Sequence, residues 1–212
     1  MMMYSKLLIS EHDFLTGHYI QLEPISNQHR EGLRNAADCD EIWLYMPHKA
    51  TKDLFNPWFD DCLEKMCSGE QMTYVVRRKT CQTILGATSY YDIQLNNKRL
   101  ALGYSWYSPE VWGSMVNPES KLLMLMQAFE RWDMNRIEIG TDSRNIHSYN
   151  AIKKLGATEE GLLRQHMILH DNALTDTIIF SILSSEWPDI KMQLIKRLYH
   201  TLDKTQRDIT LI

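Results

Sequence analysis

Residues 112–157 read WGSMVNPESKLLMLMQAFERWDMNRIEIGTDSRNIHSYNAIKKLGA and decide the interpretation of the whole chain. The stretch contains, in order, a short loop, a helical pattern, a strand pattern and a second helical pattern that stops at a glycine. A loop that runs into a helix offers free backbone N–H groups at the positive end of the helix dipole. Such a loop suits the binding of a phosphate group.

The first helical pattern has a recognisable start and one apolar face. Asn117 is an N-cap candidate, Pro118 suits the first helical position and Glu119 supplies an acid in the first turn. The apolar residues then recur at helical spacing, at Leu122, Leu125, Phe129 and Trp132. The sequence therefore predicts a helix with one buried face.

The second half of the stretch predicts a strand followed by a helix. Ile137, Ile139 and Thr141 alternate, as they do when one face of a strand is buried. Asn145 can cap the next helix, and Gly156 lies where that helix should end. In that helix one face is shared by Ser148, Ala151, Ile152 and Leu155.

The whole stretch resembles the acetyl-CoA-binding core of the GNAT acetyltransferase superfamily. The resemblance is to the branch that includes the ribosomal-protein N-terminal (alanine/serine) acetyltransferases. In that branch a W-G-x-G loop precedes a small residue or Asn and then T/P-E, and N-x-x-S-x-x-A-x-x-K-L-G follows later. The matching residues here are Trp112-Gly113-Ser114-Met115, Asn117-Pro118-Glu119, Asn145, Ser148, Ala151 and Lys154-Leu155-Gly156. The likeness extends over roughly residues 17–190.

The resemblance implies a fold and a cosubstrate. The expected fold is α/β (α+β), a mixed and mostly antiparallel central sheet with helices on both faces. Acetyl-CoA would bind in a cleft between two splayed central strands. Ser148 would act as a catalytic residue that protonates the leaving thiolate, directly or through water. The residues expected to bind the cofactor are Trp112, Gly113, Ser114, Met115, Val116, Asn117, Lys121, Asn145 and Ser148.

Each of these residues also has an ordinary structural interpretation. Asn145 can be only an N-cap, Ser148 only a small packing residue, and Lys121 only a solvated surface lysine. Met115 stands where the family has a second glycine, and a positive φ there would strain the backbone by about 1–2 kcal/mol. Ile152 replaces a tyrosine acid of many relatives, which leaves Ser148 as the best remaining donor.

The acceptor side has weaker candidates. Tyr104 and Trp106 lie on the strand that leads into the loop, and His166 lies on a late hairpin with Glu160. These side chains are either packing residues or contacts for the acceptor. A protein α-amino group has a pKa of about 7.7–8.0 and a lysine side chain one of about 10.4, and the sequence shows no strong base. An N-terminus or a small amine is therefore the expected acceptor.

Composition sets the broad class. The chain has 212 residues, 44% of them hydrophobic, and a net charge of −4. These values suit one soluble domain and give no sign of a DNA-binding face. We expect a lead-in at 1–16, a single acetyltransferase domain at 17–202 and a tail at 203–212. No run suggests a membrane span or a signal peptide, so a cytoplasmic protein is expected. The four cysteines are expected to be reduced, with no metal site.

The remaining patterns give an element order. The chain is expected to run β, two or three helices, three β, α, β, α, β-β and α. The first of these strands covers Tyr19–Ile25, and Gly103 is expected to mark either a bulge or a close approach of another backbone. The late hairpin turns at Asp171-Asn172, and a final helix carries Ile190, Leu194, Leu198 and Leu202 on one face.

Two functional hypotheses follow. The leading one is an acetyl-CoA-dependent N-acetyltransferase that acts by direct transfer to a primary amine, such as a ribosomal protein N-terminus. The alternative is a non-catalytic acyl-CoA sensor or interaction module with the same fold. The sequence leaves open whether the protein forms a homodimer through the late hairpin or the last helix.

Overall fold

The computed structural model describes residues 13–200 of the chain, and the sheet is its organising feature. Eight strands are arranged in the order β1-β2-β3-β4-β5-β6-β8-β7. Every neighbouring pair is antiparallel except β5 and β6, which run parallel. The strands are Leu15–Thr16 (β1), Ile20–Pro24 (β2), Met72–Arg78 (β3), Ile84–Gln94 (β4), Arg99–Tyr107 (β5), Arg136–Asp142 (β6), Thr158–Ile168 (β7) and Leu174–Leu183 (β8).

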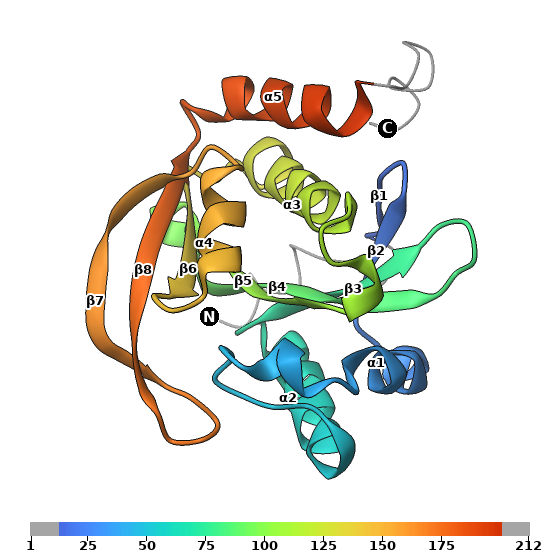
Figure 1. Ribbon diagram of the computed structural model, residues 1–212. Helices are drawn as coiled ribbons and strands as arrows, with labels where there is room; N and C mark the ends of the chain where they lie inside the picture. The colour runs from blue at the N-terminus through green and yellow to red at the C-terminus, as the bar shows by residue number, and fades with distance from the viewer. Residues whose placement is uncertain (1–12, 201–212) are drawn as a thin grey trace.

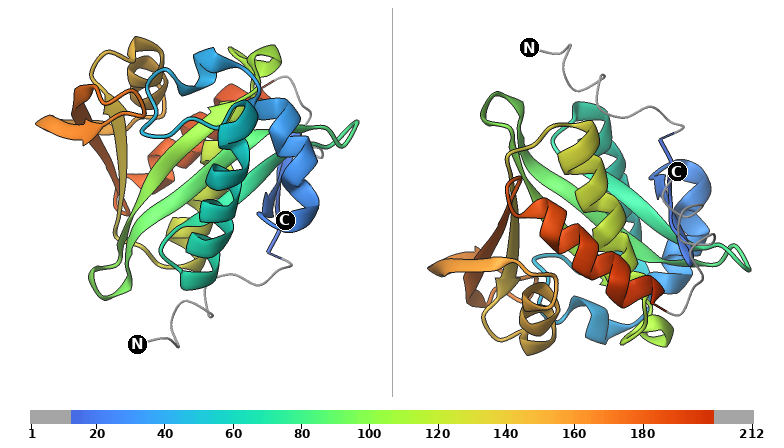
Figure 2. Two further views of the ribbon diagram at one scale, coloured as in Figure 1. Left: turned by 90° about the horizontal axis from the view of Figure 1, so that it is seen from below. Right: turned by 90° about the horizontal axis from the view of Figure 1, so that it is seen from above.

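The helices lie on both faces of this sheet. One face carries Val116–Met126 (α3), Ile146–Lys153 (α4) and Trp187–Tyr199 (α5), and the other carries Arg30–Ala37 (α1) and Phe55–Ser68 (α2). Figure 2 shows the same separation from above and below. A π-helical turn, Gln127–Arg131, extends α3. The expected mixed sheet with helices on both faces is confirmed.

Each face of the sheet has its own apolar core. The larger core joins the α3, α4 and α5 face to the sheet and includes Leu122, Leu125, Ile152 and Leu194. The smaller core lies under α1 and α2, where Leu33, Trp43, Trp58, Phe59 and Trp106 pack together. The helical spacing of these apolar residues is what fixes each helix against its face.

The parallel pair β5 and β6 is the feature that positions the site. The two strands pair at only three successive positions, from Arg99↔Arg136 to Ala101↔Glu138. Beyond Ala101, β5 continues along β4 while β6 continues along β8. The two strands therefore splay apart, and their facing edges are left without a strand partner in the second half of β5.

The observed helices and strands differ from the expected ones at several places. Leu15 and Thr16 pair with β2 although the sequence had placed them in the lead-in, because Leu15 buries its side chain in the larger core. Among the two or three helices expected after the first strand, the segment Asp40–Trp43 is a 3-10 turn rather than an α-helix. The expected tail at 203–212, most of the lead-in, and Leu202 lie outside the described residues. Within residues 13–200, no helix is both long and apolar enough to cross a membrane.

Candidate functional site

The loop between β5 and α3 is held in shape by its own hydrogen bonds. The indole of Trp112 donates to the carbonyl oxygen of Tyr107 at 2.8 Å, and the residue is 53% exposed. Gly113 has a φ of 71°, a conformation that L side chains rarely adopt. The glycine thus turns the chain from the strand toward the helix.

The free N–H groups of this loop differ in part from those expected. Ser114 N–H donates to the carbonyl of Val111, and Val116 N–H donates to the Ser114 hydroxyl at 3.2 Å. The N–H groups of Gly113, Met115 and Asn117 have no acceptor among the described residues. A bound anion would therefore find three donors here, and those of Ser114 and Val116 are already in use.

Met115 is not strained. Its φ is −77° and its ψ is −5°, which is the ordinary right-handed helical region. The positive φ lies at Gly113 instead, so the missing second glycine carries no backbone penalty in this conformation. Helix α3 also begins earlier than expected, at Val116, with Met115 as its N-cap. Asn117 is therefore a first-turn residue and does not cap the helix.

Glu119 ties this helix to both ends of the described chain. Its carboxylate accepts hydrogen bonds from the backbone N–H groups of His18, Tyr19 and Ile20 and from the Tyr199 hydroxyl. Glu119 is completely buried, and four donors offset the burial of its charge. The sequence identified it only as a first-turn acid, since its partners lie about 80–100 residues away.

Lys121 does not lie where the phosphate prediction needs it. The side chain is only 6% exposed and runs inward to the sheet, where its Nζ is 2.5 Å from the Ser105 hydroxyl and 3.4 Å from that of Thr88. Burial lowers the pKa of its amine to about 7. The alternative of a solvated surface lysine is also wrong. Lys121 is a buried residue that contacts β4 and β5.

Asn145 and Ser148 begin helix α4. The Asn145 side-chain oxygen accepts from the Ser148 backbone N–H at 3.0 Å, which makes Asn145 an N-cap. Its side-chain NH₂ group and the Ser148 hydroxyl have no partner among the described residues, so both are available to a ligand. Ile152 is buried in the larger core and brings no polar atom to the helix.

A bulge interrupts β5 just after it parts from β6. The pairing with β4 shifts between Ser89↔Gly103 and Ala87↔Trp106, and Tyr104 takes a φ of 45°. An extra residue at this point lets Tyr104 and Trp106 both contribute to the α2 side of the sheet. The bulge expected at Gly103 is confirmed one residue further along.

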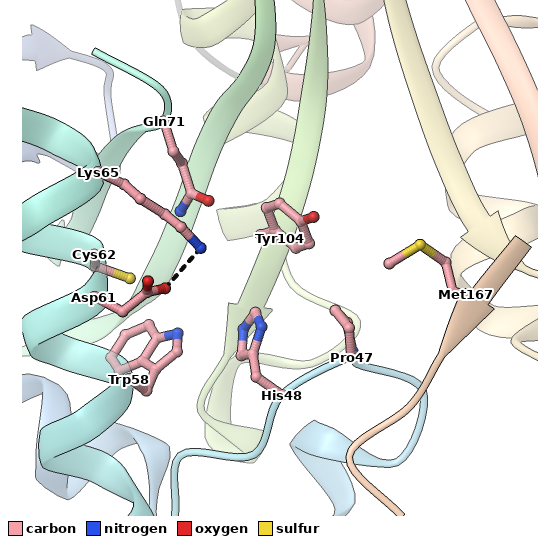
Figure 3. A pocket seen from close by; sticks show the side chains of 9 residues that line it. All are labelled: Pro47, His48, Trp58, Asp61, Cys62, Lys65, Gln71, Tyr104 and Met167. Carbon is pink, nitrogen blue, oxygen red and sulfur yellow. Dashed lines mark hydrogen bonds and ion pairs between the residues drawn. The ribbon is translucent and has the colours of Figure 1, made fainter. Parts of the chain in front are cut away.

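Beside the bulge lies a cavity of about 190 Å³, which we call the α2-side pocket (Figure 3). Its walls come from α2, the loop before α2, β5 and the β7–β8 hairpin. A hydrogen bond of 3.2 Å connects His170 Nε2 with the Trp43 carbonyl oxygen. This bond joins the hairpin to the segment before α2. The lining residues are Pro47, His48, Trp58, Asp61, Cys62, Lys65, Gln71, Tyr104 and Met167.

His48 is the unusual member of this pocket. Its Nε2 is buried and has no hydrogen-bond partner among the described residues. Burial, assisted by the positive charge of Lys65, lowers the pKa of His48 to about 4, so the imidazole is neutral at pH 7. Its ring lies 5.6 Å from that of Tyr104 and 6.3 Å from that of Trp58. Nothing in the irregular stretch around His48 suggested this role.

The rest of the polar wall comes from α2. Lys65 Nζ lies 2.8 Å from Asp61 Oδ2, and both side chains are partly exposed. Cys62 lines the pocket beside them. Burial raises the pKa of the Cys62 thiol to about 12, so it remains protonated and is a poor nucleophile.

Of the three side chains expected to contact the acceptor, only one lines the pocket. Tyr104 lines the pocket, whereas Trp106 is 3% exposed and packs in the smaller core against Trp43 and Trp58. His166 is exposed on β7 and lies 3.1 Å from the Thr177 hydroxyl. It does not belong to the residues that line the pocket.

Glu160 is a structural residue. It forms an ion pair with Arg136 and accepts from Ser181, and the guanidinium holds the pKa of its carboxyl at about 2. Its candidacy for orienting an amine is therefore not supported. Residues 13–200 contain no group of three side chains that could hold a metal ion.

The family comparison agrees with this geometry. The family described as acetyltransferase (GNAT) domain matches residues 20–158, which is more than half of the chain. The putative ribosomal N-acetyltransferase YdaF of Bacillus subtilis (strain 168) is 25% identical over 105 residues. That alignment covers 50% of this chain and spans only 56% of the relative's length.

Two solved structures show the same fold. A GCN5-related N-acetyltransferase from Brucella melitensis is 25% identical with a TM-score of 0.83, and 94% of this chain and 96% of that one are covered. Mycobacterium smegmatis RimJ, solved in complex with CoA-disulfide, has a TM-score of 0.74 at 16% identity. In that case 87% of this chain and 92% of the other are covered, and the likeness concerns the fold.

Proposed function

Because the chain belongs to the acetyltransferase (GNAT) domain family, we propose that it transfers an acetyl group from acetyl-CoA to a primary amine. The transfer is direct, in a ternary complex. One observation carries this proposal: the second half of β5 has lost its β6 partner and leads straight into a loop with three free N–H groups. An extended thioester can thus bind along the strand while its phosphates meet the loop.

The cofactor contacts follow from the free donors. The N–H groups of Gly113, Met115 and Asn117 bind the diphosphate, and the start of α3 adds the positive end of its dipole. The side-chain NH₂ group of Asn145 donates to the cofactor from the facing helix. The exposed indole of Trp112 borders the same loop.

Ser148 is the proposed proton donor. As the amine attacks the thioester carbonyl, the carbon–sulfur bond breaks and the departing thiolate needs a proton. The Ser148 hydroxyl has no partner of its own within the described residues, and Ile152 offers none in its place. A hydroxyl is a weak acid, so its contribution is expected through a hydrogen bond or a bridging water.

The acceptor amine approaches from the α2 side. Tyr104 lies in the half of β5 that no longer pairs with β6, and it also lines the α2-side pocket. The pocket therefore adjoins the place proposed for the thioester. A ribosomal protein N-terminus or a small amine is the acceptor. An acetyl-cysteine intermediate is disfavoured, because the Cys62 thiol keeps its proton near neutral pH.

Isothermal titration with acetyl-CoA tests the binding half of the proposal. We expect heat release and a raised melting temperature, and neither effect at millimolar ligand would refute it. Release of CoA thiol with a panel of primary amines tests the catalytic half. Ser148→Ala should lower turnover while acetyl-CoA affinity stays the same, and unchanged turnover would remove Ser148 from the mechanism.

A non-catalytic acyl-CoA sensor is the competing function. The missing second glycine at Met115 would favour this function if it strained the loop, but the backbone angles of Met115 are ordinary. The buried Ile152, in place of an acid, is the remaining argument. Acetyl-CoA binding without thiol release for every amine tested would favour the sensor.

A further inference from the structure

The α2-side pocket has two chemically different walls. In Figure 3 the Lys65 ammonium and the Asp61 carboxylate lie together on the side of α2, and Met167 lies on the opposite side. His48 and Tyr104 lie between them. A ligand in the pocket would therefore meet a charged pair at one end and an imidazole and aromatic rings along its length.

Lys65 is the one ammonium among the described residues that line the pocket. Its hydrogen bond to Asp61 raises its pKa, so it is charged at neutral pH. An ammonium has three donors, and the 2.8 Å contact with Asp61 uses one of them. Lys65 can therefore pair with a second anionic oxygen without giving up Asp61.

His48 offers the opposite chemistry. A neutral imidazole has one donor nitrogen and one acceptor nitrogen. The buried Nε2 of His48 has no partner among the described residues, which is costly for a polar atom unless a ligand or water supplies one. With the ring proton on Nδ1, Nε2 accepts a hydrogen bond from an amine.

We propose that the α2-side pocket binds a small acceptor that carries both a primary amine and a carboxylate, in the manner of a free α-amino acid. Its carboxylate pairs with Lys65, and its amine donates to His48 Nε2 beside Tyr104. This inference rests on the proposed acetyltransferase function and narrows its acceptor. The N-terminus of a protein fits less well, because it has an amide where the free acid has its carboxylate.

The size of the pocket supports a small ligand. Its volume of about 190 Å³ lies below the roughly 300–1,000 Å³ of pockets for drug-sized ligands. The hydrogen bond between His170 and Trp43 also joins the two segments that border it, which restricts the room for a continuing peptide chain.

The reaction then balances without another reagent. The neutral amine nitrogen attacks the thioester carbonyl carbon, a carbon–nitrogen bond forms and the carbon–sulfur bond breaks. The nitrogen loses one proton to water, and the departing thiolate gains one. The products are an N-acetylamino acid and CoA, and the carboxylate on Lys65 is unchanged.

Matched acceptors test the role of the carboxylate. Thiol release is measured with the common L-amino acids and with their C-terminal amides, together with a ribosomal N-terminal peptide. For the best amino acid we expect kcat/KM to exceed that of its amide by about tenfold, which corresponds to about 1.4 kcal/mol. Lys65→Met should remove this preference, because the variant lacks the ammonium that pairs with the carboxylate.

Lys191→Met is the matched control. Lys191 is also a partly exposed helical lysine in an ion pair, with Glu130, but it lies on α5 on the other face of the sheet. It should keep the preference for the acid. Equal use of acid and amide by the wild type would overturn the inference, as would a preference that survives in Lys65→Met.

A binding measurement separates this inference from the proposed function. Saturation-transfer NMR with the CoA-loaded protein detects an amino acid in the pocket without any turnover. Binding of the acid that weakens in Lys65→Met, with no acetylation, would support the inference and refute the acetyltransferase proposal. No binding of any free amino acid, or better use of the ribosomal peptide than of all of them, would overturn the inference.

Discussion

Lys121 and His48 are two basic side chains on opposite faces of strand β5, the first buried and the second only partly buried. The Lys121 amine lies on the α3 side, 2.5 Å from the Ser105 hydroxyl and 3.4 Å from that of Thr88. The His48 imidazole lies on the α2 side, and its Nε2 has no partner among the described residues. Burial is the first cause of a lowered pKa in both, to about 7 for Lys121 and about 4 for His48.

The difference between the two faces distinguishes a basic group with a structural role from one that can bind a ligand. Lys121 is enclosed and satisfied by hydroxyls of the sheet, so it acts in the structure of the protein. His48 lines a cavity and its Nε2 has no partner among the described residues, so we expect it to serve a ligand. We therefore expect changes to Lys121 to alter stability and changes to His48 to alter acetylation.

The largest effect is expected from Lys121→Met in the pH dependence of stability. An unfolded lysine keeps its proton up to a pH of about 10.4, while folded Lys121 loses it near pH 7. Between these values the unfolded state binds more protons, so the unfolding free energy of the wild type rises with pH. Relative to Lys121→Met it should rise by about 3–4 kcal/mol between pH 7 and pH 10.

Urea denaturation of both proteins at several pH values measures this difference. Methionine has nearly the length of lysine and no charge, so the variant should fold. Curves that stay parallel over the whole range would contradict the assignment of a depressed pKa to Lys121.

The next effect concerns His48→Phe, which keeps a ring but removes the acceptor nitrogen. We expect kcat/KM for the amine to fall by about tenfold or more, about 1.4 kcal/mol, because the amine loses its hydrogen bond. The unfolding free energy should stay the same or rise by up to about 1 kcal/mol, since an unsatisfied buried nitrogen is removed. Thiol release measures the change in kcat/KM, and thermal melting measures the change in stability.

Lys121→Met serves as the reciprocal control for this experiment. It should change stability with pH while kcat/KM at a fixed pH changes little. If His48→Phe instead unfolds the protein and leaves the activity of the folded fraction intact, the contrast between the two faces is wrong.

The smallest effect separates Gly113 from Met115 in the loop on the α3 side. Gly113→Ala places a side chain at a φ of 71° and should lower the unfolding free energy by about 1 kcal/mol. Met115→Ala leaves a residue with ordinary angles and should change it by less than about 0.5 kcal/mol. Chemical denaturation of both variants would show the order, and a larger loss at Met115 would contradict it.

The spacing of apolar residues and the signals at element ends were enough to predict the order of helices and strands. The alternation in β6, the apolar faces of α3 and α4 and the glycine stop all depend on local spacing, which a sequence displays directly. The bulge in β5 was signalled by Gly103, although the residue with the unusual backbone is Tyr104.

The errors arose where a residue's role depends on distant partners. Lys121 looked like a surface residue because nothing local reveals that Ser105 and Thr88 lie beneath it. His48 belongs to an irregular loop without periodicity, and its neighbours in the pocket come from four separate segments. Trp106 was a candidate contact, but the bulge turns it into the smaller core.

A crystal structure with a non-hydrolysable acetyl-CoA analogue tests the central claim most directly. We expect the diphosphate to lie within hydrogen-bond distance of the N–H groups of Gly113, Met115 and Asn117. We expect the acetyl end to lie between the splayed strands β5 and β6, beside Tyr104 and facing the α2-side pocket. A CoA analogue bound elsewhere, or with its acetyl end on the side of Lys121 away from the pocket, would contradict it.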